Sequence, residues 1–163
     1  AALRLGLAPD LVWLVAELAV SPFAHALQRL VFASAALSDA LCLWNRGYCL
    51  ACGSWPALAE VAQGRRILRC PFCATAWEST VSGCVYCGED GDAFADSGPH
   101  KDHPDRRIQL CRACGAYLKM IDVAALSPFP LLAVTDLDTM ELDVTAMERG
   151  YVRLPIKSFV SRR

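Results

Sequence analysis

The first 47 residues carry the hydrophobic spacing that is typical of α-helices. Large apolar residues recur three and four positions apart from Phe23 to Val31, which places them along one face of a helix. Asp10 is a suitable N-cap for a first helix over residues 11–20, and the Ser21-Pro22 pair is a suitable start for a second. We therefore predict two helices in this stretch, whose apolar faces either pack against other elements or belong with a partner segment that is missing from the chain.

From residue 48 to about residue 121 the helical spacing gives way to short β-like runs that alternate with Cys-x-x-Cys turns. The Gln63-Gly64 pair marks a tight turn between two such runs, which predicts a hairpin. The polar stretch Gly88–Arg107 is expected to be a mobile loop at the tip of a second hairpin. Strands are expected at residues 56–61, 65–69 and 75–81 and around residues 93–95 and 108–110.

The C-terminal part is predicted to hold an extended connector followed by one helix. Two prolines within residues 127–130 favour extended backbone there. The helix is expected from Asp136 to Arg149, with Gly150 as its stop. Its packing face is expected to consist of Leu137, Met140, Val144 and Met147. Its solvated face is expected to carry the acidic residues Asp136, Asp138, Glu141 and Asp143.

These patterns predict an α+β fold built from four consecutive parts. A helical region comes first, two tandem rubredoxin-like or zinc-ribbon-like modules follow, and the C-terminal helix packs back onto them. The parts are residues 1–47 (helical region), 48–82 (first Cys₄ module), 83–121 (second Cys₄ module) and 122–163 (connector and C-terminal helix).

Composition narrows the class of protein further. The 163-residue chain is 55% hydrophobic with a net charge of −1, so it is neither intrinsically disordered nor strongly basic. Without a basic stripe, general affinity for nucleic acid is not expected. The longest uncharged stretch of the apolar N-terminal part, Leu18–Gln28, is too short to cross a bilayer, so membrane insertion is not expected. No export signal stands out, and a cytoplasmic location is predicted.

The nine cysteines change the picture most. Eight of them form four Cys-x-x-Cys pairs, and each pair places two thiolates on one side of a tight turn. Two such turns supply the four sulfur ligands of a tetrahedral site, which suits Zn²⁺ or a single iron ion. We therefore predict two metal ions, iron or zinc, in two Cys₄ sites. The predicted ligands are Cys49, Cys52, Cys70, Cys73, Cys84, Cys87, Cys111 and Cys114.

The intervals between the pairs favour sequential pairing. The predicted hairpin over residues 56–69 brings the first pair to the second, and the hairpin through Phe94 and Gln109 brings the third pair to the fourth. Trp77, on the strand that links the modules, is expected to pack over the first of them. An interleaved arrangement, first with third and second with fourth, is the alternative. A thioredoxin-type redox role is a further alternative, but it calls for a single pair at a helix start in a βαβ unit.

The remaining candidate residues have plainer interpretations. Cys42 lies on a predicted third short helix, from about residue 38 to Trp44, and is interpreted as a buried inert thiol. His100 and His103 could bind metal, but with eight thiolates available they are interpreted as part of a solvated loop. No Ser-His-Asp set, phosphate-binding glycine loop or paired-carboxylate site stands out, so no enzymatic activity is predicted.

Several motifs occur together in one order between Tyr48 and Arg153. They are Cys49-Leu-Ala-Cys52-Gly-Ser-Trp-Pro56, Leu68-Arg-Cys70-Pro-Phe-Cys73-Ala-Thr-Ala-Trp77-Glu78, Cys84-Val-Tyr-Cys87, Cys111-Arg-Ala-Cys114-Gly-Ala-Tyr117-Leu-Lys119, Asp136-Leu-Asp-Thr139-Met-Glu-Leu142-Asp143 and Gly150-Tyr-Val-Arg153. This ordered set resembles the FdhE family of formate dehydrogenase accessory proteins. The Tyr-Leu-Lys motif after the fourth cysteine pair and the acidic helix motif carry most of the specificity.

The resemblance implies a helical N-terminal part followed by rubredoxin-like modules that bind iron through the paired cysteines. It also implies a cytoplasmic protein that interacts with the catalytic subunit of an exported respiratory formate dehydrogenase and assists its assembly or checks its readiness for export. The chain departs from the family pattern at Leu50, where the family often has proline, in the Gly88–Arg107 loop and in a shorter helical part before Tyr48. It also begins without Met, which indicates a processed, tagged or partial chain.

Three functional hypotheses follow from the sequence. The first is a non-catalytic maturation factor that docks the formate dehydrogenase catalytic subunit through a surface shaped by two metal sites. The second is a rubredoxin-like electron-transfer protein, and the third is a zinc-ribbon adaptor for nucleic acid, which the near-neutral charge disfavours. The apolar N-terminal helices are also compatible with a homo-oligomer.

Overall fold

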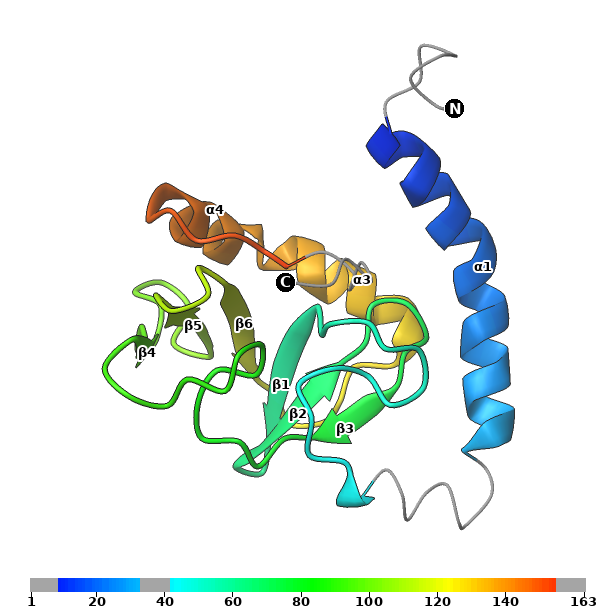
Figure 1. Cartoon of the computed structure of the whole chain (residues 1–163), viewed down its shortest axis with the longest axis horizontal. Helices are drawn as coiled ribbons and strands as arrows, with labels where there is room; N and C mark the ends of the chain where they lie inside the picture. Colours follow the sequence, from blue (N-terminus) through cyan, green and yellow to red (C-terminus); the bar gives the residue numbers. More distant parts are fainter. Residues whose placement is uncertain (1–8, 33–41, 155–163) are drawn as a thin grey trace, which may run out of the picture.

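Six strands form one mixed sheet at the centre of the molecule (Figure 1). The computed structural model describes residues 9–32 and 42–154. The order of the strands across the sheet is β3-β2-β1-β6-β5-β4. Their bounds are β1 (Leu58–Ala62), β2 (Arg65–Arg69), β3 (Ala76–Glu78), β4 (Phe94–Asp96), β5 (Arg106–Cys111) and β6 (Tyr117–Asp122).

The sheet consists of two three-stranded antiparallel units that lie side by side. β2 pairs antiparallel with β1 and β3, and β5 pairs antiparallel with β4 and β6. The units meet where β1 runs parallel to β6, with Glu60 opposite Ile121. The second unit therefore repeats the strand order of the first. The predicted α+β fold, with two tandem Cys₄ modules followed by a helical C-terminal part, is confirmed.

The predicted hairpins are confirmed as well. Gln63 and Gly64 join β1 to β2, and both have positive φ angles, 53° and 75°, as a two-residue type I′ turn requires. In the second module β4 pairs with β5 so that Ala95 lies opposite Leu110. The strand expected over residues 75–81 is shorter in the structure, where β3 covers three residues.

The two predicted N-terminal helices are one continuous helix, α1 (Pro9–Val31), so the predicted boundary at Ser21-Pro22 is wrong. Pro22 lacks an N–H group and removes one helical hydrogen bond, but the turns on either side continue the helix. The Ser21 hydroxyl donates to the carbonyl oxygen of Phe72 at 2.7 Å, which ties α1 to the first module. No helix in the described ranges is long and apolar enough to cross a membrane.

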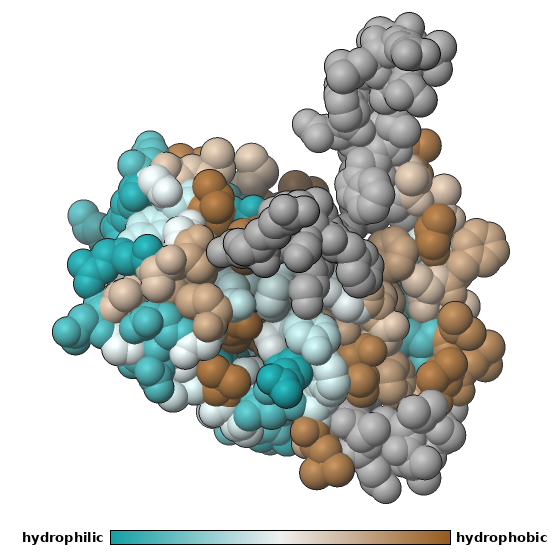
Figure 2. Space-filling model, viewed as in Figure 1, coloured by the Kyte–Doolittle hydropathy of each residue, from teal (hydrophilic) through white to brown (hydrophobic). Residues whose placement is uncertain are grey.

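α1 turns a different face to the protein from the one predicted. Ala24 is partly buried against the core of the first module, because its small side chain lets the helix approach closely. On the predicted packing face, by contrast, Phe23, Leu27 and Leu30 are 75%, 62% and 75% exposed. Within the described residues, no other element therefore covers this face, and the alternative of packing against other elements is wrong there. Figure 2 shows hydrophobic side chains gathered on the described part of α1.

The predicted third short helix lies largely outside the described residues. Cys42 is described, and it is exposed, so its interpretation as a buried thiol is wrong. The nearby Trp44 is partly buried against the core of the first module. Its indole N–H donates to the carbonyl oxygen of Tyr48 at 2.8 Å.

Two helices, rather than the single predicted one, follow the sheet. α3 (Phe129–Asp138) and α4 (Met140–Glu148) are separated at Thr139. α3 begins inside the predicted extended connector with Pro128 as its N-cap, since the first turn of a helix tolerates proline. The predicted stop is confirmed, because α4 ends just before Gly150, whose φ is +83°.

The C-terminal helices also turn a different face to the sheet from the one predicted. α4 packs Leu142 and Ala146 against Ile108 and Leu110 of β5. The four residues expected on the packing face are instead between 50% and 66% exposed: Leu137, Met140, Val144 and Met147.

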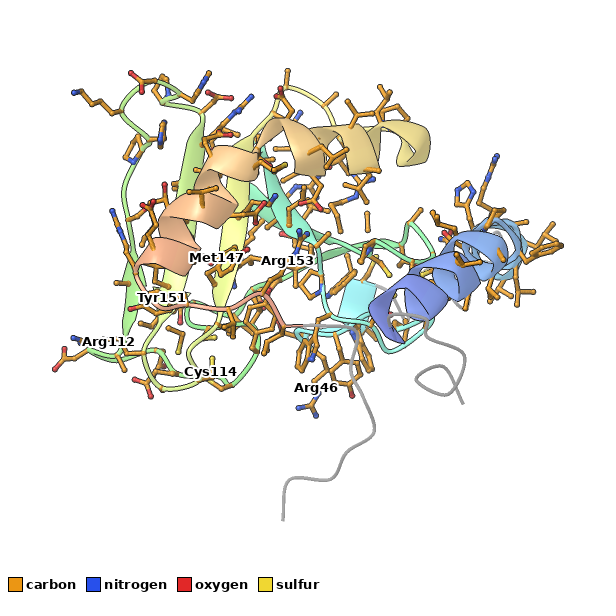
Figure 3. All side chains as sticks on the ribbon, turned by 90° about the horizontal axis from the view of Figure 1, so that it is seen from above. Arg46, Arg112, Cys114, Met147, Tyr151 and Arg153 are labelled. Atoms are coloured by element: carbon orange, nitrogen blue, oxygen red, sulfur yellow. The ribbon has the colours of Figure 1, made fainter. Side chains whose placement is uncertain are left out.

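Acidic side chains of these helices face the sheet because the sheet presents buried cations to them. Lys119 of β6 is 0% exposed, and its ammonium lies 2.5 Å from a carboxylate oxygen of Asp136 and 2.8 Å from one of Asp143. Asp143 also accepts a hydrogen bond from the Tyr117 hydroxyl at 2.6 Å. Arg153, which follows α4 (Figure 3), lies 2.8 Å from a carboxylate oxygen of Asp136. We call these five residues the ion cluster.

The prediction of a solvated acidic face is therefore wrong for Asp136 and Asp143. A buried ammonium without a partner costs far more than an exposed apolar side chain, so the carboxylates take the inner face of the helices. Glu141 likewise pairs with Arg106 of β5 at 2.8 Å. Among the four acidic residues, Asp138 keeps the most exposed side chain, at 66%.

The ion cluster predicts a large stability effect for its central lysine. Replacing Lys119 with Met leaves Asp143 without its cation and Asp136 with Arg153 alone, and we expect the free energy of unfolding to fall by about 3 kcal/mol or more in chemical denaturation. Asp122→Asn is the matched control, because it breaks an exposed pair with Arg107, and it should cost less than about 1 kcal/mol. Equal effects of the two substitutions would contradict this account.

Candidate metal centres

The eight paired cysteines form two separate groups of thiols. In each group the four sulfur atoms all lie within 4.8 Å of one another. The first group joins the first Cys-x-x-Cys pair to the second, and the other joins the third pair to the fourth, so the cysteines are grouped sequentially and not interleaved. The first thiol group is Cys49, Cys52, Cys70 and Cys73, and the second thiol group is Cys84, Cys87, Cys111 and Cys114.

Three of the four cysteine turns share one backbone pattern. The N–H of the glycine after the second cysteine donates to the carbonyl oxygen of the first, as from Gly53 to Cys49 at 2.9 Å, and Gly88 and Gly115 repeat this at 2.9 and 2.8 Å. Each of these glycines has a φ between 70° and 82°, a conformation that glycine adopts without strain. In the remaining turn Ala74 takes this position, with a φ of 66°. The turns therefore present both sulfurs of a pair on one side.

The spacing of the sulfur atoms fits a tetrahedral metal cage. In the first thiol group, Cys49 and Cys73 are 3.6 Å apart and Cys52 and Cys70 are 3.4 Å apart. In the second, the sulfurs of Cys84 and Cys114 are 3.7 Å apart and those of Cys87 and Cys111 are 3.6 Å apart. Four sulfurs bound at ~2.3 Å to one ion would lie roughly 3.8 Å from one another, whereas a disulfide requires about 2.05 Å. Each group could therefore hold a metal ion, and its four soft donors suit zinc and iron alike.

Hydrogen bonds among the thiols of the first group lower the pKa of two of them and raise the pKa of the other two. The hydrogen bond with Cys49 lowers the pKa of Cys52 and lowers the pKa of Cys73 to about 7. Hydrogen bonds within the group raise the pKa of Cys49 and Cys70, with burial adding to the increase. In the second group burial raises the pKa of Cys114 to about 11. Protons therefore compete with a metal ion for the thiol sulfurs, and the apparent affinity of the thiol groups for metal should rise with pH.

One edge of each thiol group is open to solvent. Cys52 is the exposed member of the first group and Cys87 of the second, while Cys114 is intermediate and the other five thiols are buried. Behind the first group, Trp77 is 2% exposed and packs in the same cluster as three of the thiols, which confirms its expected position. Its indole N–H donates to the carbonyl oxygen of Arg46 at 2.9 Å.

The other residues considered as ligands lie outside both groups. His100 and His103 stack on each other with ring centroids 5.9 Å apart, and among the described residues no set of metal donors includes either of them. The exposed Cys42 likewise belongs to neither group.

Sequence reasoning missed an aromatic chain that connects the two thiol groups. Tyr48, next to Cys49, lies edge-on to Trp55 with ring centroids 6.1 Å apart, and Trp55 lies edge-on to Tyr86 at 5.3 Å. Tyr86 is part of the third cysteine turn, so the chain spans the two modules. The position of each tyrosine beside a cysteine pair was the available signal.

The fold and the thiol geometry define a metal-binding protein of tandem rubredoxin-like modules. No family model matches the chain. It is, however, 33% identical over 119 residues to the FdhE homolog of Aquifex aeolicus and 31% identical over 120 residues to the FdhE of Escherichia coli O127:H6, matches that cover 68% and 71% of this chain. The chain belongs to the FdhE family.

A solved structure agrees with this placement. The crystal structure of the FdhE protein from Pseudomonas aeruginosa matches 68% of this chain at 31% identity with a TM-score of 0.57. The matches cover 41% and 38% of the two curated relatives and 40% of the solved chain. The chain therefore corresponds to about two fifths of the length of these proteins.

The two thiol groups predict a metal stoichiometry that depends on single cysteines. We expect about two metal ions per chain after anaerobic purification, because each group supplies four sulfur ligands. Cys70→Ser should remove one equivalent and leave the other, as should Cys111→Ser. Elemental analysis with an absorption spectrum measures the count and separates ferric thiolate from zinc.

Cys42→Ser is the matched control for these variants, since Cys42 belongs to neither thiol group. It should retain both metal ions. A loss of metal from Cys42→Ser equal to that from Cys70→Ser would contradict the assignment of ligands, as would a wild-type chain that binds fewer than two ions.

Proposed function

We propose that the chain acts as a metal-binding accessory protein in the formation of a respiratory formate dehydrogenase. Family membership supports an accessory or formation role. The observation that carries the proposal is the pair of four-thiol groups, each with its sulfur atoms within 4.8 Å of one another, in two modules that share one continuous sheet. In this proposal the bound ions hold the surface of the two modules in shape, and they take no part in a chemical reaction.

The bound metals would be iron or zinc, held by the two thiol groups as closed four-sulfur sites. A closed site of this kind contributes to folding, because metal binding and the ordering of the ligand turns are one event. Each module has three short strands, so the metal would supply much of its stability. All eight paired cysteines are proposed as ligands.

The ion cluster around Lys119 favours a structural role over a catalytic one. The Lys119 ammonium has three acceptors: the carbonyl oxygen of Asp136 at 2.8 Å and carboxylate oxygens of Asp136 and Asp143. An ammonium has three N–H bonds, so none is left for a substrate. Burial and the hydrogen bond with Asp143 raise the pKa of Tyr117, which makes its hydroxyl a poor base at neutral pH.

The proposed partner is the catalytic subunit of the formate dehydrogenase, bound in the cytoplasm before its export. Large apolar side chains exposed on α1 and on the C-terminal helices supply surface for such a contact. A second candidate function is electron transfer of the rubredoxin type. It is favoured by the exposed edges at Cys52 and Cys87, and a reversible one-electron titration of an iron-loaded chain distinguishes it.

The proposal predicts metal-dependent capture of the partner. Immobilised metal-loaded chain should retain the formate dehydrogenase catalytic subunit from an anaerobic extract, as measured by mass spectrometry. Cys70→Ser, which breaks the first metal site, should reduce the retained subunit at least about tenfold, because its module loses the metal that orders it.

Cys42→Ser is again the control and should retain the subunit as the wild type does. No enrichment of the subunit by the metal-loaded wild type would contradict the proposed function. Undiminished capture by Cys70→Ser would contradict the role assigned to the first metal site.

A further inference from the structure

The third cysteine turn, which supplies two sulfurs to the second thiol group, is built into the core of the first module. The two residues between its cysteines are Val85 and Tyr86. Val85 is 8% exposed and lies in one hydrophobic cluster with three cysteines of the first thiol group, Cys49, Cys70 and Cys73. Tyr86 is partly buried against the same cluster. The turn therefore belongs to the second thiol group by its sulfurs and to the first module by the side chains between them.

The backbone of this turn also touches the segment that leads into the first cysteine turn. A Cβ atom built on Gly47 would overlap the carbonyl oxygen of Val85, so the two backbones are closer than a residue with a side chain allows. Gly47 is not among the glycines with a positive φ, so its missing Cβ serves this contact rather than a tight turn. It comes two residues before Cys49, a member of the first thiol group.

Aromatic side chains add further contacts between the same turns. Trp55, which follows the first cysteine turn, lies edge-on to Tyr86 with ring centroids 5.3 Å apart. Aromatic pairs favour this arrangement at separations of about 4.5–7 Å, and it stabilises them beyond the area that they bury. The Tyr86 hydroxyl donates to the carbonyl oxygen of Tyr117, which follows the fourth cysteine turn, at 3.2 Å. We define the junction as Gly47, Trp55, Val85 and Tyr86.

We propose that the junction couples the two metal sites, so that metal binding at either site raises the affinity of the other. A metal ion orders the cysteine turns that hold it. Because the third turn packs against the first turn and its flanks, ordering one thiol group also orders part of the other. The second ion then binds at a smaller cost in conformational entropy. The proposal rests on the assignment of the paired cysteines as ligands and is independent of the partner proposed above.

The test compares overall and single-site metal affinities of the reduced, metal-free full chain. Zn²⁺ is titrated in competition with a chelator of known affinity. Cys111→Ser keeps only the first site and Cys70→Ser only the second, so each gives one single-site association constant. The coupling factor is the overall constant for both ions in the wild type divided by the product of these two constants. We expect a factor of at least about 5, whereas independent sites would give about 1.

Two substitutions at the junction should remove the coupling when they are measured in the same way. Gly47→Ala places a methyl group against the third turn, and Tyr86→Leu removes the ring that contacts Trp55. Each should reduce the coupling factor to less than about 2. Both variants should still bind two ions at saturating Zn²⁺, which elemental analysis checks. Tyr86→Phe keeps the ring and should retain the coupling.

The matched controls lie outside the junction. Gly91→Ala adds the same methyl group where a Cβ would meet only a carboxylate oxygen of Glu89, at 3.0 Å. Tyr151→Leu truncates a tyrosine that is partly buried against the core of the second module. Both controls should keep the coupling factor of the wild type.

Several outcomes would overturn the proposal. A wild-type coupling factor near that of independent sites would refute it outright. A factor that survives Gly47→Ala or Tyr86→Leu would assign the coupling to another contact, such as the pairing of β1 with β6, and refute the junction as its carrier. A control that loses the coupling as fully as the junction variants would do the same. Each of these results leaves the proposed accessory function standing, because that function fails separately if the chain captures no catalytic subunit.

Discussion

The gathering of four cysteine sulfurs within 4.8 Å of one another in each module is the constraint on which the rest of the structure depends. Each module offers three short strands, and the core that they can build alone is small. The cysteine turns sit beside the hairpin strands, so one ion would connect the first turn of a module to its second. A structural zinc site of this kind contributes on the order of 10–16 kcal/mol to folding in small peptides. That magnitude exceeds what the strands alone could supply.

Strand pairing and buried ion pairs join the two modules to each other and to the C-terminal helices. β1 and β6 pair in parallel and close the sheet across the module boundary. On β1, the fully buried Glu60 binds Arg69 of β2, and both side chains hold the backbone of Ser127, through its N–H and its carbonyl oxygen. This contact fixes the chain just before α3 begins. The ion cluster around Lys119 then fixes α3 and α4 over the second module.

These buried charges explain why apolar side chains are exposed. A helix normally buries its apolar stripe, but α3 and α4 must bring carboxylates to Lys119 and Arg106 of the sheet. Leu142 and Ala146 remain on the inner face of α4, and the larger apolar residues lie outside. α1 also exposes large apolar residues, and it contacts the core of the first module through the small side chain of Ala24. The molecule therefore has buried ion pairs in its interior and large exposed apolar side chains on α1 and on the C-terminal helices.

The sequence was most informative where local chemistry dictates structure. Cysteine spacing and the Gln63-Gly64 turn predicted the two modules and the first hairpin, because both depend on residues close in the chain. The parallel junction of β1 with β6 joins segments about sixty residues apart, and no local pattern marks it. The orientation of the C-terminal helices was mispredicted because hydrophobic spacing cannot reveal that Lys119, on another element, is buried. The motif containing Lys119 was visible, but its partners emerged only from the fold.

X-ray absorption at the metal edge counts the sulfur ligands of each bound ion. We expect a first coordination shell of four sulfur atoms at about 2.3 Å, with no nitrogen or oxygen ligand, in a chain that carries two ions. The same shell should persist when one thiol group is removed, because both groups supply equivalent donors. A shell containing nitrogen or oxygen, or fewer than four sulfurs, would contradict the assignment of the eight paired cysteines as two closed sites.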